Sequence, residues 1–155
     1  MINITLNINN EEHQVEIAPY HTLCDVLRDK LGFTDVKNGC TEGECGSCTV
    51  LVDGIPVASC LMLAAQIQGK KITTARGLTT NGKLHPVQEK FVEYGAIQCG
   101  YCTPGMILVA KALLDKNPSP TEDEIRTAIS GNICRCTGYQ QIVEAIMAAA
   151  KDVNE

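Results

Sequence analysis

The sequence has few aromatic residues and no long run of apolar residues. It contains no tryptophan, two phenylalanines and four tyrosines among 155 residues. A chain of this length forms one ordinary domain or two small ones, and a small domain with a thin core usually needs an additional constraint. No apolar run approaches the ~18 residues of a transmembrane helix, so no membrane span is expected.

An excess of positive charge and an export signal are also missing. The formal net charge is -5, which disfavours binding to nucleic acid or anionic lipid, because both attract lysine and arginine. The first eight residues, MINITLNI, lack the basic region, continuous apolar core and cleavage site of a signal peptide. We therefore expect a cytosolic protein that binds neither nucleic acid nor membranes.

The common catalytic motifs are missing as well. The sequence has no G-x-G-x-x-G, no P-loop and no nucleophile elbow. It also has no histidine or carboxylate cluster that suggests a mononuclear metal. The chain is therefore expected to catalyse no reaction alone.

Cysteine, by contrast, is abundant, with nine in the chain. In a secreted protein they would form disulfides, whereas in a reducing cytosol they are more often metal ligands. A cytosolic chain with many cysteines and few aromatic residues is typical of a metal protein.

The first third of the chain predicts a β-hairpin followed by a helix. Apolar residues alternate in 2–8 and again in 15–17, with a turn at Asn9–Asn10. Thr22 is suited to cap a helix that runs to Leu31, and Gly32 stands where a left-handed residue would end it.

The next segment predicts a long loop and more strands. Residues 37–48 are polar and glycine-rich, with no helical or strand period. Residues 49–57 predict a second hairpin around the Asp53–Gly54 turn, and 71–74 could add one strand. One helix on a mixed sheet of four or five short strands is compatible with a ubiquitin-like β-grasp roll.

After Gly77 the pattern becomes helical, which indicates a domain boundary near residues 75–83 and domains 1–76 and 77–155. Four helices are expected, the last running to about Ala150; their starts are signalled by His85–Pro86, Thr103–Pro104, Thr121 with Glu124, and Thr137–Gly138. In two of them a cysteine directly precedes a threonine, which suggests two helical hairpins related by a pseudo-twofold axis.

The first cysteine set lies in the glycine-rich loop and just after the second hairpin. It comprises Cys40, Cys45, Cys48 and Cys60. The C-x4-C-x2-C spacing is that of plant-type 2Fe-2S loops. Glycines allow the backbone to approach an inorganic cluster closely. A zinc loop is the alternative, although zinc knuckles usually bring C-x2-C pairs.

The second set is ambiguous when taken alone. It comprises Cys99, Cys102, Cys134 and Cys136. Such pairs occur in structural zinc sites, but helix starts favour an anionic cluster, because free amides and helix dipoles would face it. A disulfide between Cys134 and Cys136 is disfavoured by their closeness in sequence. Cys24 is left over and is interpreted as a core residue.

Three strings around these cysteines resemble a known family. They are CTEGECGSCTV at 40–50, QCGYCTPGM at 98–106 and GNICRCTGY at 131–139. With them the chain is similar, over nearly its whole length, to the iron–sulfur subunit of the molybdenum hydroxylases, the xanthine dehydrogenase and aldehyde oxidase family.

The resemblance implies an α+β chain with two 2Fe-2S clusters. A plant-type ferredoxin-like domain of β-grasp fold would hold one cluster on the first cysteine set. An all-α four-helix domain would hold the other on the second set, nearer the molybdenum cofactor. Gln98 and Cys136 would approach the pterin of that cofactor.

It also implies a reaction and partners. The complex would hydroxylate an electron-poor carbon, with water as the oxygen source. A large subunit would bind molybdopterin and substrate, and a medium subunit would bind FAD, as in heterotrimeric members. Electrons would pass through the helical-domain cluster, then the ferredoxin-domain cluster, then usually to the flavin.

Other readings stay open. Residues 138–143, GYQQIV, look most like xanthine dehydrogenase small subunits, but nicotinate, carbon monoxide and hydroxybenzoyl-CoA members are similar. A zinc-stabilised interaction module and a free ferredoxin that shuttles between enzymes are the competing classes of function.

Overall fold

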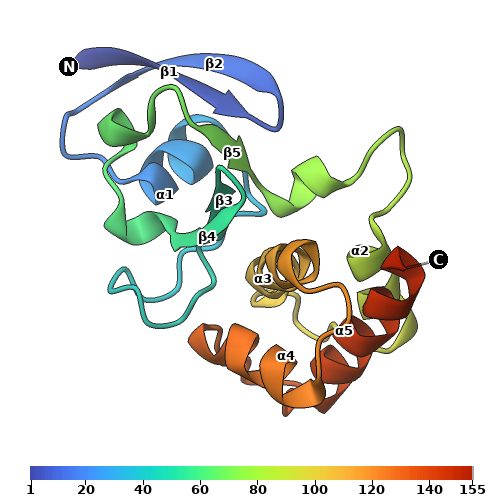
Figure 1. Ribbon diagram of the computed structural model, residues 1–155. Coiled ribbons are helices and arrows are strands. Elements are labelled where there is room, and N and C mark those ends of the chain that lie inside the picture. The colour runs from blue at the N-terminus through green and yellow to red at the C-terminus, as the bar shows by residue number, and fades with distance from the viewer. Residues whose placement is uncertain (155) are drawn as a thin grey trace.

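A computed structural model describes residues 1–154 and divides the chain into a sheet-containing half and a helical half (Figure 1). The strands are β1 (Ile2–Ile8), β2 (Glu11–Ile17), β3 (Thr49–Val52), β4 (Ile55–Ala58) and β5 (Lys71–Thr73). The α-helices are α1 (Leu23–Asp25), α2 (Pro86–Glu93), α3 (Thr103–Lys116), α4 (Glu122–Ala128) and α5 (Gln140–Val153). The expected α+β class is therefore confirmed.

The five strands form one mixed sheet in the order β2-β1-β5-β3-β4. The two predicted hairpins, β1–β2 and β3–β4, are antiparallel, while β1 and β5 pair in parallel. Both hairpin turns need left-handed residues: Asn9 and Asn10 in the first, Asp53 and Gly54 in the second, all with positive φ. Asparagine, aspartate and glycine adopt that conformation most easily, which explains why these turns could be predicted.

The helix expected after Thr22 is only partly regular. Thr22 and Asp25 form a reciprocal capping box, but α1 is followed by a π-helical segment, η1 (Val26–Lys30). In this wider turn the Leu31 amide donates to the carbonyl of Val26 at 3.0 Å. The sequence pattern shows the cap and the apolar face, and it does not distinguish the two helical registers.

The helices of the second half begin where expected, with one exception. The predicted caps His85 and Thr121 start α2 and α4, and both form capping boxes. The prediction that the last helix begins at Thr137–Gly138 is wrong, because α5 begins at Gln140. Gly138 and Tyr139 have φ of 66° and 72°, which a right-handed helix cannot accommodate.

Two hydrophobic cores lie on opposite sides of β3. All four β3 residues are buried. Val50 and Val52 enter the core of the N-terminal half, whereas Leu51 belongs to the core built by the helices. A strand covered on both faces lacks polar–apolar alternation, and β3 accordingly has three consecutive apolar residues after a buried Thr49. In Figure 1, α3 is the helix of the C-terminal half that lies nearest to the sheet, and it packs on β3 and β4.

Between the halves, the first residues of 3-10 helix η4 (Ala75–Leu78) are held by contacts from both halves. Arg76 donates through its amide to Asp35 Oδ2 at 2.9 Å, and its guanidinium lies 4.8 Å from the centre of the Phe33 ring. Gln88 of α2 donates to the Ala75 carbonyl at 3.0 Å. The connection is therefore anchored to the sheet and to the first helix.

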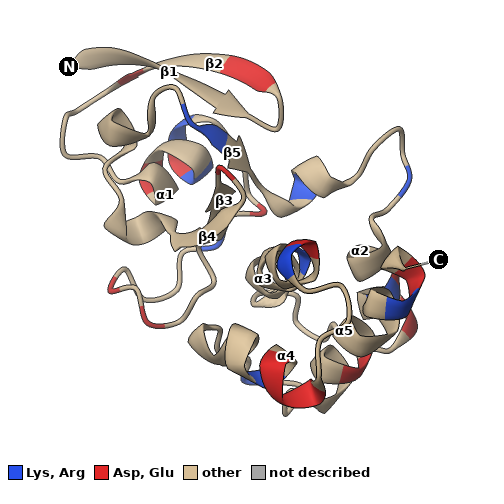
Figure 2. Cartoon of the chain, in the orientation of Figure 1, with Lys and Arg blue, Asp and Glu red and all other residues tan. Residues whose placement is uncertain are grey.

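Charged residues of both signs are scattered over both halves (Figure 2). None of the helices between residues 1 and 154 combines the length and the apolar character needed to cross a bilayer.

Candidate metal centres

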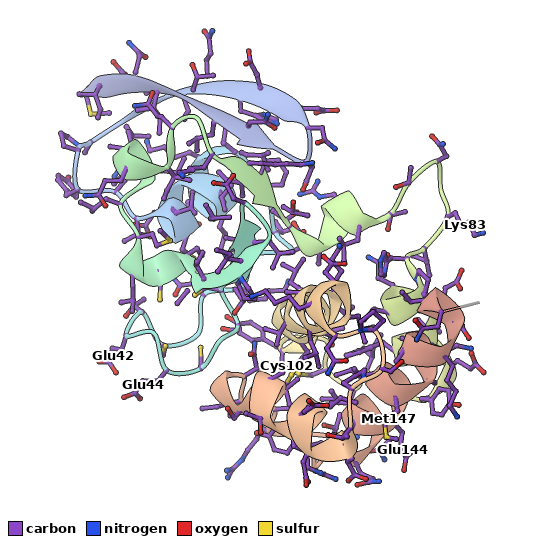
Figure 3. All side chains as sticks on the ribbon, in the orientation of Figure 1. Glu42, Glu44, Lys83, Cys102, Glu144 and Met147 are labelled. Atoms are coloured by element: carbon purple, nitrogen blue, oxygen red, sulfur yellow. The ribbon has the colours of Figure 1, made fainter. Side chains whose placement is uncertain are left out.

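The first cysteine set lies in the irregular loop before β3 and, for Cys60, just after β4. Cys48 and Cys60 are buried, and Cys60 lies in 3-10 helix η2 (Ser59–Leu61), while Cys40 and Cys45 are half-buried. The amides of Glu42 and Cys45 point at Cys40 Sγ, at 3.4 and 3.5 Å. Figure 3 shows the Glu42 side chain on the outer rim of this loop.

These backbone amides change the acidity of the thiol. Hydrogen bonds from the amides of Cys45, Glu42 and Glu44, in that order of importance, lower the pKa of Cys40 to about 6. A thiolate is the form that binds metal. The loop backbone therefore favours the thiolate form of Cys40, which is the form a metal would bind.

The second set gathers at the start of α3 and in the loop before α5. Cys102 is the half-buried N-cap residue of α3, and Figure 3 labels it between α3 and α4 in this view. Cys134 is buried, whereas Cys99 and Cys136 are exposed. The expectation that C-x-C directly opens the last helix is not met, because Thr137, Gly138 and Tyr139 intervene before α5.

Thr137 holds Cys134 by two hydrogen bonds. Its amide lies 3.5 Å and its hydroxyl 3.1 Å from Cys134 Sγ. Burial acts to raise the pKa of Cys134, but hydrogen bonds from the Thr137 hydroxyl and amide, together with those from the Cys136 amide and the Cys102 side chain, lower it overall. This donor pair was not singled out from the sequence.

The thiols lie near one another in pairs. The side-chain neighbours that affect acidity are Cys40 with Cys45, Cys48 with Cys60, Cys99 with Cys136, and Cys102 with Cys134. Burial first, and then the neighbouring thiol, raise the pKa of Cys60 and of Cys102 to about 12. Binding of metal would release these protons.

The paired arrangement fits a two-iron cluster better than a single ion. Each iron of a 2Fe-2S cluster with four cysteine ligands takes two thiolates, so the four sulfurs share no common centre. A zinc ion would draw all four to one point. Among residues 1–154 no three cysteine, histidine or acidic side chains converge on such a point. The donor set and its pairing therefore suit 2Fe-2S clusters.

The two cysteine sets border the same cavity. A cavity of about 260 Å³ lies between them, and its cysteines come from both: Cys40, Cys45, Cys99, Cys102, Cys134 and Cys136. The Ile133 amide donates to the Cys45 carbonyl at 2.9 Å, and the Tyr101 hydroxyl donates to the Asn38 carbonyl at 2.6 Å. These two hydrogen bonds directly connect residues 88 and 63 positions apart in the chain.

This close approach depends on two small residues. A Cβ added at Gly46 would collide with the Gly131 carbonyl and would come 2.7 Å from Asn132 Nδ2. One added at Gly105, in the first turn of α3, would lie 2.5 Å from the Gly46 carbonyl. The Asn132 amide group instead donates to that carbonyl at 3.0 Å.

The remaining predicted residues are placed differently. Cys24 is buried in the N-terminal core, where burial raises the pKa of its thiol to about 11. Gln98 lies exposed next to Cys99 and, like Cys136, is open to contact from outside the chain.

Fold and site together define an iron–sulfur protein with two 2Fe-2S-binding domains. Residues 6–75 match the family described as "2Fe-2S iron-sulfur cluster binding domain", and residues 74–147 match "[2Fe-2S] binding domain". The expectation of two 2Fe-2S clusters is thereby confirmed.

Similarity to known proteins of about the same length shows to which family of iron–sulfur proteins the chain belongs. The nicotinate dehydrogenase small FeS subunit of Eubacterium barkeri is 53% identical over 150 residues, covering 97% of this chain and 96% of that protein. The xanthine dehydrogenase iron-sulfur-binding subunit of Escherichia coli O157:H7 is 47% identical over 152 residues, covering 97% and 95%. The chain belongs to the family of small iron–sulfur subunits of the molybdenum hydroxylases, and it is an electron-transfer subunit of that family.

Solved structures agree in fold. The quinoline 2-oxidoreductase of Pseudomonas putida 86 contains a chain with a TM-score of 0.95 and 44% identity, covering 99% of this chain and 96% of that chain. The aldehyde oxidoreductase of Desulfovibrio gigas matches with a TM-score of 0.93 and 41% identity, but the match covers only 17% of that longer chain. The same unit thus occurs both as a separate chain and as part of a larger polypeptide.

Proposed function

We propose that all eight predicted ligands bind iron, four for each cluster. One cluster is bound by Cys40, Cys45, Cys48 and Cys60, and the other by Cys99, Cys102, Cys134 and Cys136. The pairing of the thiols supports this assignment, because each neighbouring pair can serve one iron. Cys24 is not a ligand.

We further propose that the chain relays electrons between these two sites. A 2Fe-2S cluster supplies one-electron redox chemistry when bound. The observation that carries the proposal is the 2.9 Å hydrogen bond from the Ile133 amide to the Cys45 carbonyl. It connects a residue adjacent to Cys134 with a ligand of the other set. A single backbone hydrogen bond thus connects the two proposed ligand sets.

The exposed edge of the second set is the proposed contact with a molybdopterin-binding large subunit. Gln98 and Cys136 lie on this surface, and by resemblance they contact the pterin. Exposed Ile97 directly precedes Gln98, and exposed Tyr101 and Ile133 line the same cavity as Cys136, as expected for a surface covered by another chain. An FAD-binding medium subunit would receive electrons from the first set.

For the substrate, we propose a nitrogen-containing aromatic heterocycle. Three of the four relatives named above act, by their names, on nicotinate, xanthine and quinoline, and the fourth acts on aldehydes. A nicotine 6-hydroxylase small subunit of Paenarthrobacter nicotinovorans is also 47% identical over 148 residues, covering 96% of this chain and 89% of that protein. Xanthine, the substrate type that the sequence favoured, belongs to this class of compounds. Nicotinate is the alternative, and the chain is more similar in sequence to the nicotinate dehydrogenase subunit than to the xanthine dehydrogenase subunit.

The domain limits and the symmetry also stay proposals. Two separate hydrophobic cores support a division into 1–76 and 77–155. The pseudo-twofold relation of the helical hairpins rests on the repeated cysteine–threonine starts alone. We expect the complex to work in the cytosol.

The direct test is metal analysis with low-temperature EPR of the dithionite-reduced complex, isolated with its co-purifying subunits. We expect about four irons per chain and two distinct rhombic signals, as two 2Fe-2S clusters require. Zinc without an EPR signal would instead establish an interaction module. Isolation without a molybdopterin subunit would favour a shuttling ferredoxin. Turnover of nicotinate, xanthine and quinoline by the same complex then tests the substrate class.

A further inference from the structure

A buried hydroxyl lies against one cysteine sulfur in the first set. Ser47 is 5% exposed, and its Oγ lies 3.0 Å from Cys45 Sγ. The space for this contact exists because residue 39 is glycine: a Cβ there would lie 2.7 Å from the Ser47 hydroxyl and 2.8 Å from the Cys45 sulfur. When Cys45 is a metal-bound thiolate, the hydroxyl is the only possible donor of this pair.

The second set contains the same arrangement, built differently. The Thr137 hydroxyl lies 3.1 Å from Cys134 Sγ and also accepts the Tyr139 amide hydrogen at 3.2 Å. The Tyr139 hydroxyl in turn accepts the Cys134 amide hydrogen at 3.0 Å. The three residues close a ring of hydrogen bonds. Because the amide of Tyr139 occupies a lone pair of the Thr137 oxygen, the hydroxyl hydrogen is left to point at the sulfur.

Hydrogen bonds of this kind affect electron affinity. Reduction adds negative charge to the cluster and its thiolates, and a donated hydrogen bond stabilises the more negative state more strongly. Both hydroxyls are buried, since Thr137 is 9% exposed, and water therefore screens the effect little. Ser47 and Thr137 each act on one ligand of one set.

We propose that Ser47 and Thr137 are positioning residues that each raise the reduction potential of the cluster bound by their own half. The inference rests on the proposed function, because it needs both clusters to be bound. Two separate hydroxyls allow the two potentials to be set independently. The driving force for transfer between the clusters is then adjustable at either position without changing any ligand.

The test is a redox titration of the purified complex that is monitored by EPR and compares the parent with the Ser47→Ala and Thr137→Val variants. In Ser47→Ala, the signal of the first cluster should titrate at a lower potential and the other signal should not move. In Thr137→Val the reverse is expected. At a fixed potential, the ratio of reduced to oxidised cluster should fall about tenfold, which is about 59 mV for a one-electron couple.

Thr137→Ser is the matched control, because it keeps the hydroxyl and should retain the parent potential. An unchanged potential in both hydroxyl-free variants, or equal shifts of both signals in each, would overturn the inference. If a variant fails to bind its cluster, Ser47→Gly and Thr137→Ala remove the same hydroxyls with smaller side chains. If the parent complex does not show two distinct EPR signals, the result would instead count against the proposed function itself.

Discussion

At the scale of single residues, the ninth cysteine shows how position separates a proposed ligand from a core residue. Cys24 is 1% exposed in the N-terminal core, with Cys48 and Ser59 among its neighbours. Burial keeps its pKa high, but burial also raises the pKa of Cys60. Acidity therefore does not distinguish the two. The difference is that Cys60 has Cys48 as its paired thiol, and Cys24 lies outside that pair.

Cys136→Ser should therefore disturb only the cluster of the helical half. We expect its EPR signal to be lost or altered while the other signal persists, with iron falling from about four toward about two per chain. Electron transfer from the molybdopterin subunit should slow, since Cys136 is also the proposed pterin contact. Iron analysis and EPR of the purified complex check this.

Cys24→Ser is the control for that experiment. It removes an equivalent sulfur from a buried position and should leave the iron content unchanged. A drop in iron with Cys24→Ser would show that the ligand assignment is wrong.

At the scale of elements, the N-terminus of α2 carries a titratable cap. The Val87 amide donates to His85 Nδ1 at 3.2 Å, and the His85 amide donates to Gln88 Oε1 at 2.9 Å. An imidazole can accept this hydrogen bond only while Nδ1 is unprotonated. The start of the helix is therefore coupled to the protonation of one side chain.

The surroundings of His85 favour its neutral form. Burial, followed by the positive charge of Lys111, lowers its pKa below the ordinary 6.5, although Asp115 and Glu89 act in the opposite direction. The folded state thus binds this proton less well than the unfolded chain does. The stabilisation from the neutral cap is complete above pH 6.5 and is lost as the pH falls through the lower, folded-state pKa.

His85→Asn should remove this dependence, because asparagine caps a helix without titrating near neutral pH. Above pH 7 we expect the two proteins to differ by less than about 1 kcal/mol in free energy of unfolding. Below pH 6.5 the parent should lose stability relative to the variant. Thermal unfolding followed by circular dichroism from pH 5 to 8 measures the difference, and parallel profiles would contradict the prediction.

At the scale of the whole molecule, contact between the halves brings the two cysteine sets together. Gly46 has φ of 71° and faces Gly131 and Asn132 across this contact, and Gly105 of α3 lies against its carbonyl. A side chain at either position would force the loop away from the helical half. The distance between the sets thus depends on packing and on backbone conformation at the same time.

Gly46→Ala should lower the free energy of unfolding by more than about 1 kcal/mol, because alanine is strained at positive φ and the methyl group collides with the other half. The matched control is Gly69→Ala. Gly69 has φ of 76° but nothing within 4 Å of an added Cβ, so it isolates the backbone strain. Thermal unfolding should show the larger loss for Gly46→Ala, and equal losses would mean that the contact contributes nothing.

Much of the fold and of the candidate site could be predicted from local sequence. The caps Thr22 and Thr121 and the turns at Asn9–Asn10 and Asp53–Gly54 appear where expected. These features involve residues within four positions of one another, so their chemistry is readable in order along the chain. The cysteine spacing likewise indicated iron–sulfur chemistry, which the family matches confirm.

Other features follow only from tertiary packing. The left-handed Tyr139 delays α5, and its amide and hydroxyl join Thr137 to Cys134. Leu51 belongs to the helical core although its strand neighbours do not. The sequence by itself determined most of the elements, the two cysteine sets proposed as ligands and the class of protein. Only the tertiary structure decided that the Ile133 amide hydrogen-bonds to the Cys45 carbonyl and that both cysteine sets border one cavity. The reason is that contacts between distant segments depend on how the two cores pack, and such contacts leave no local pattern in the sequence.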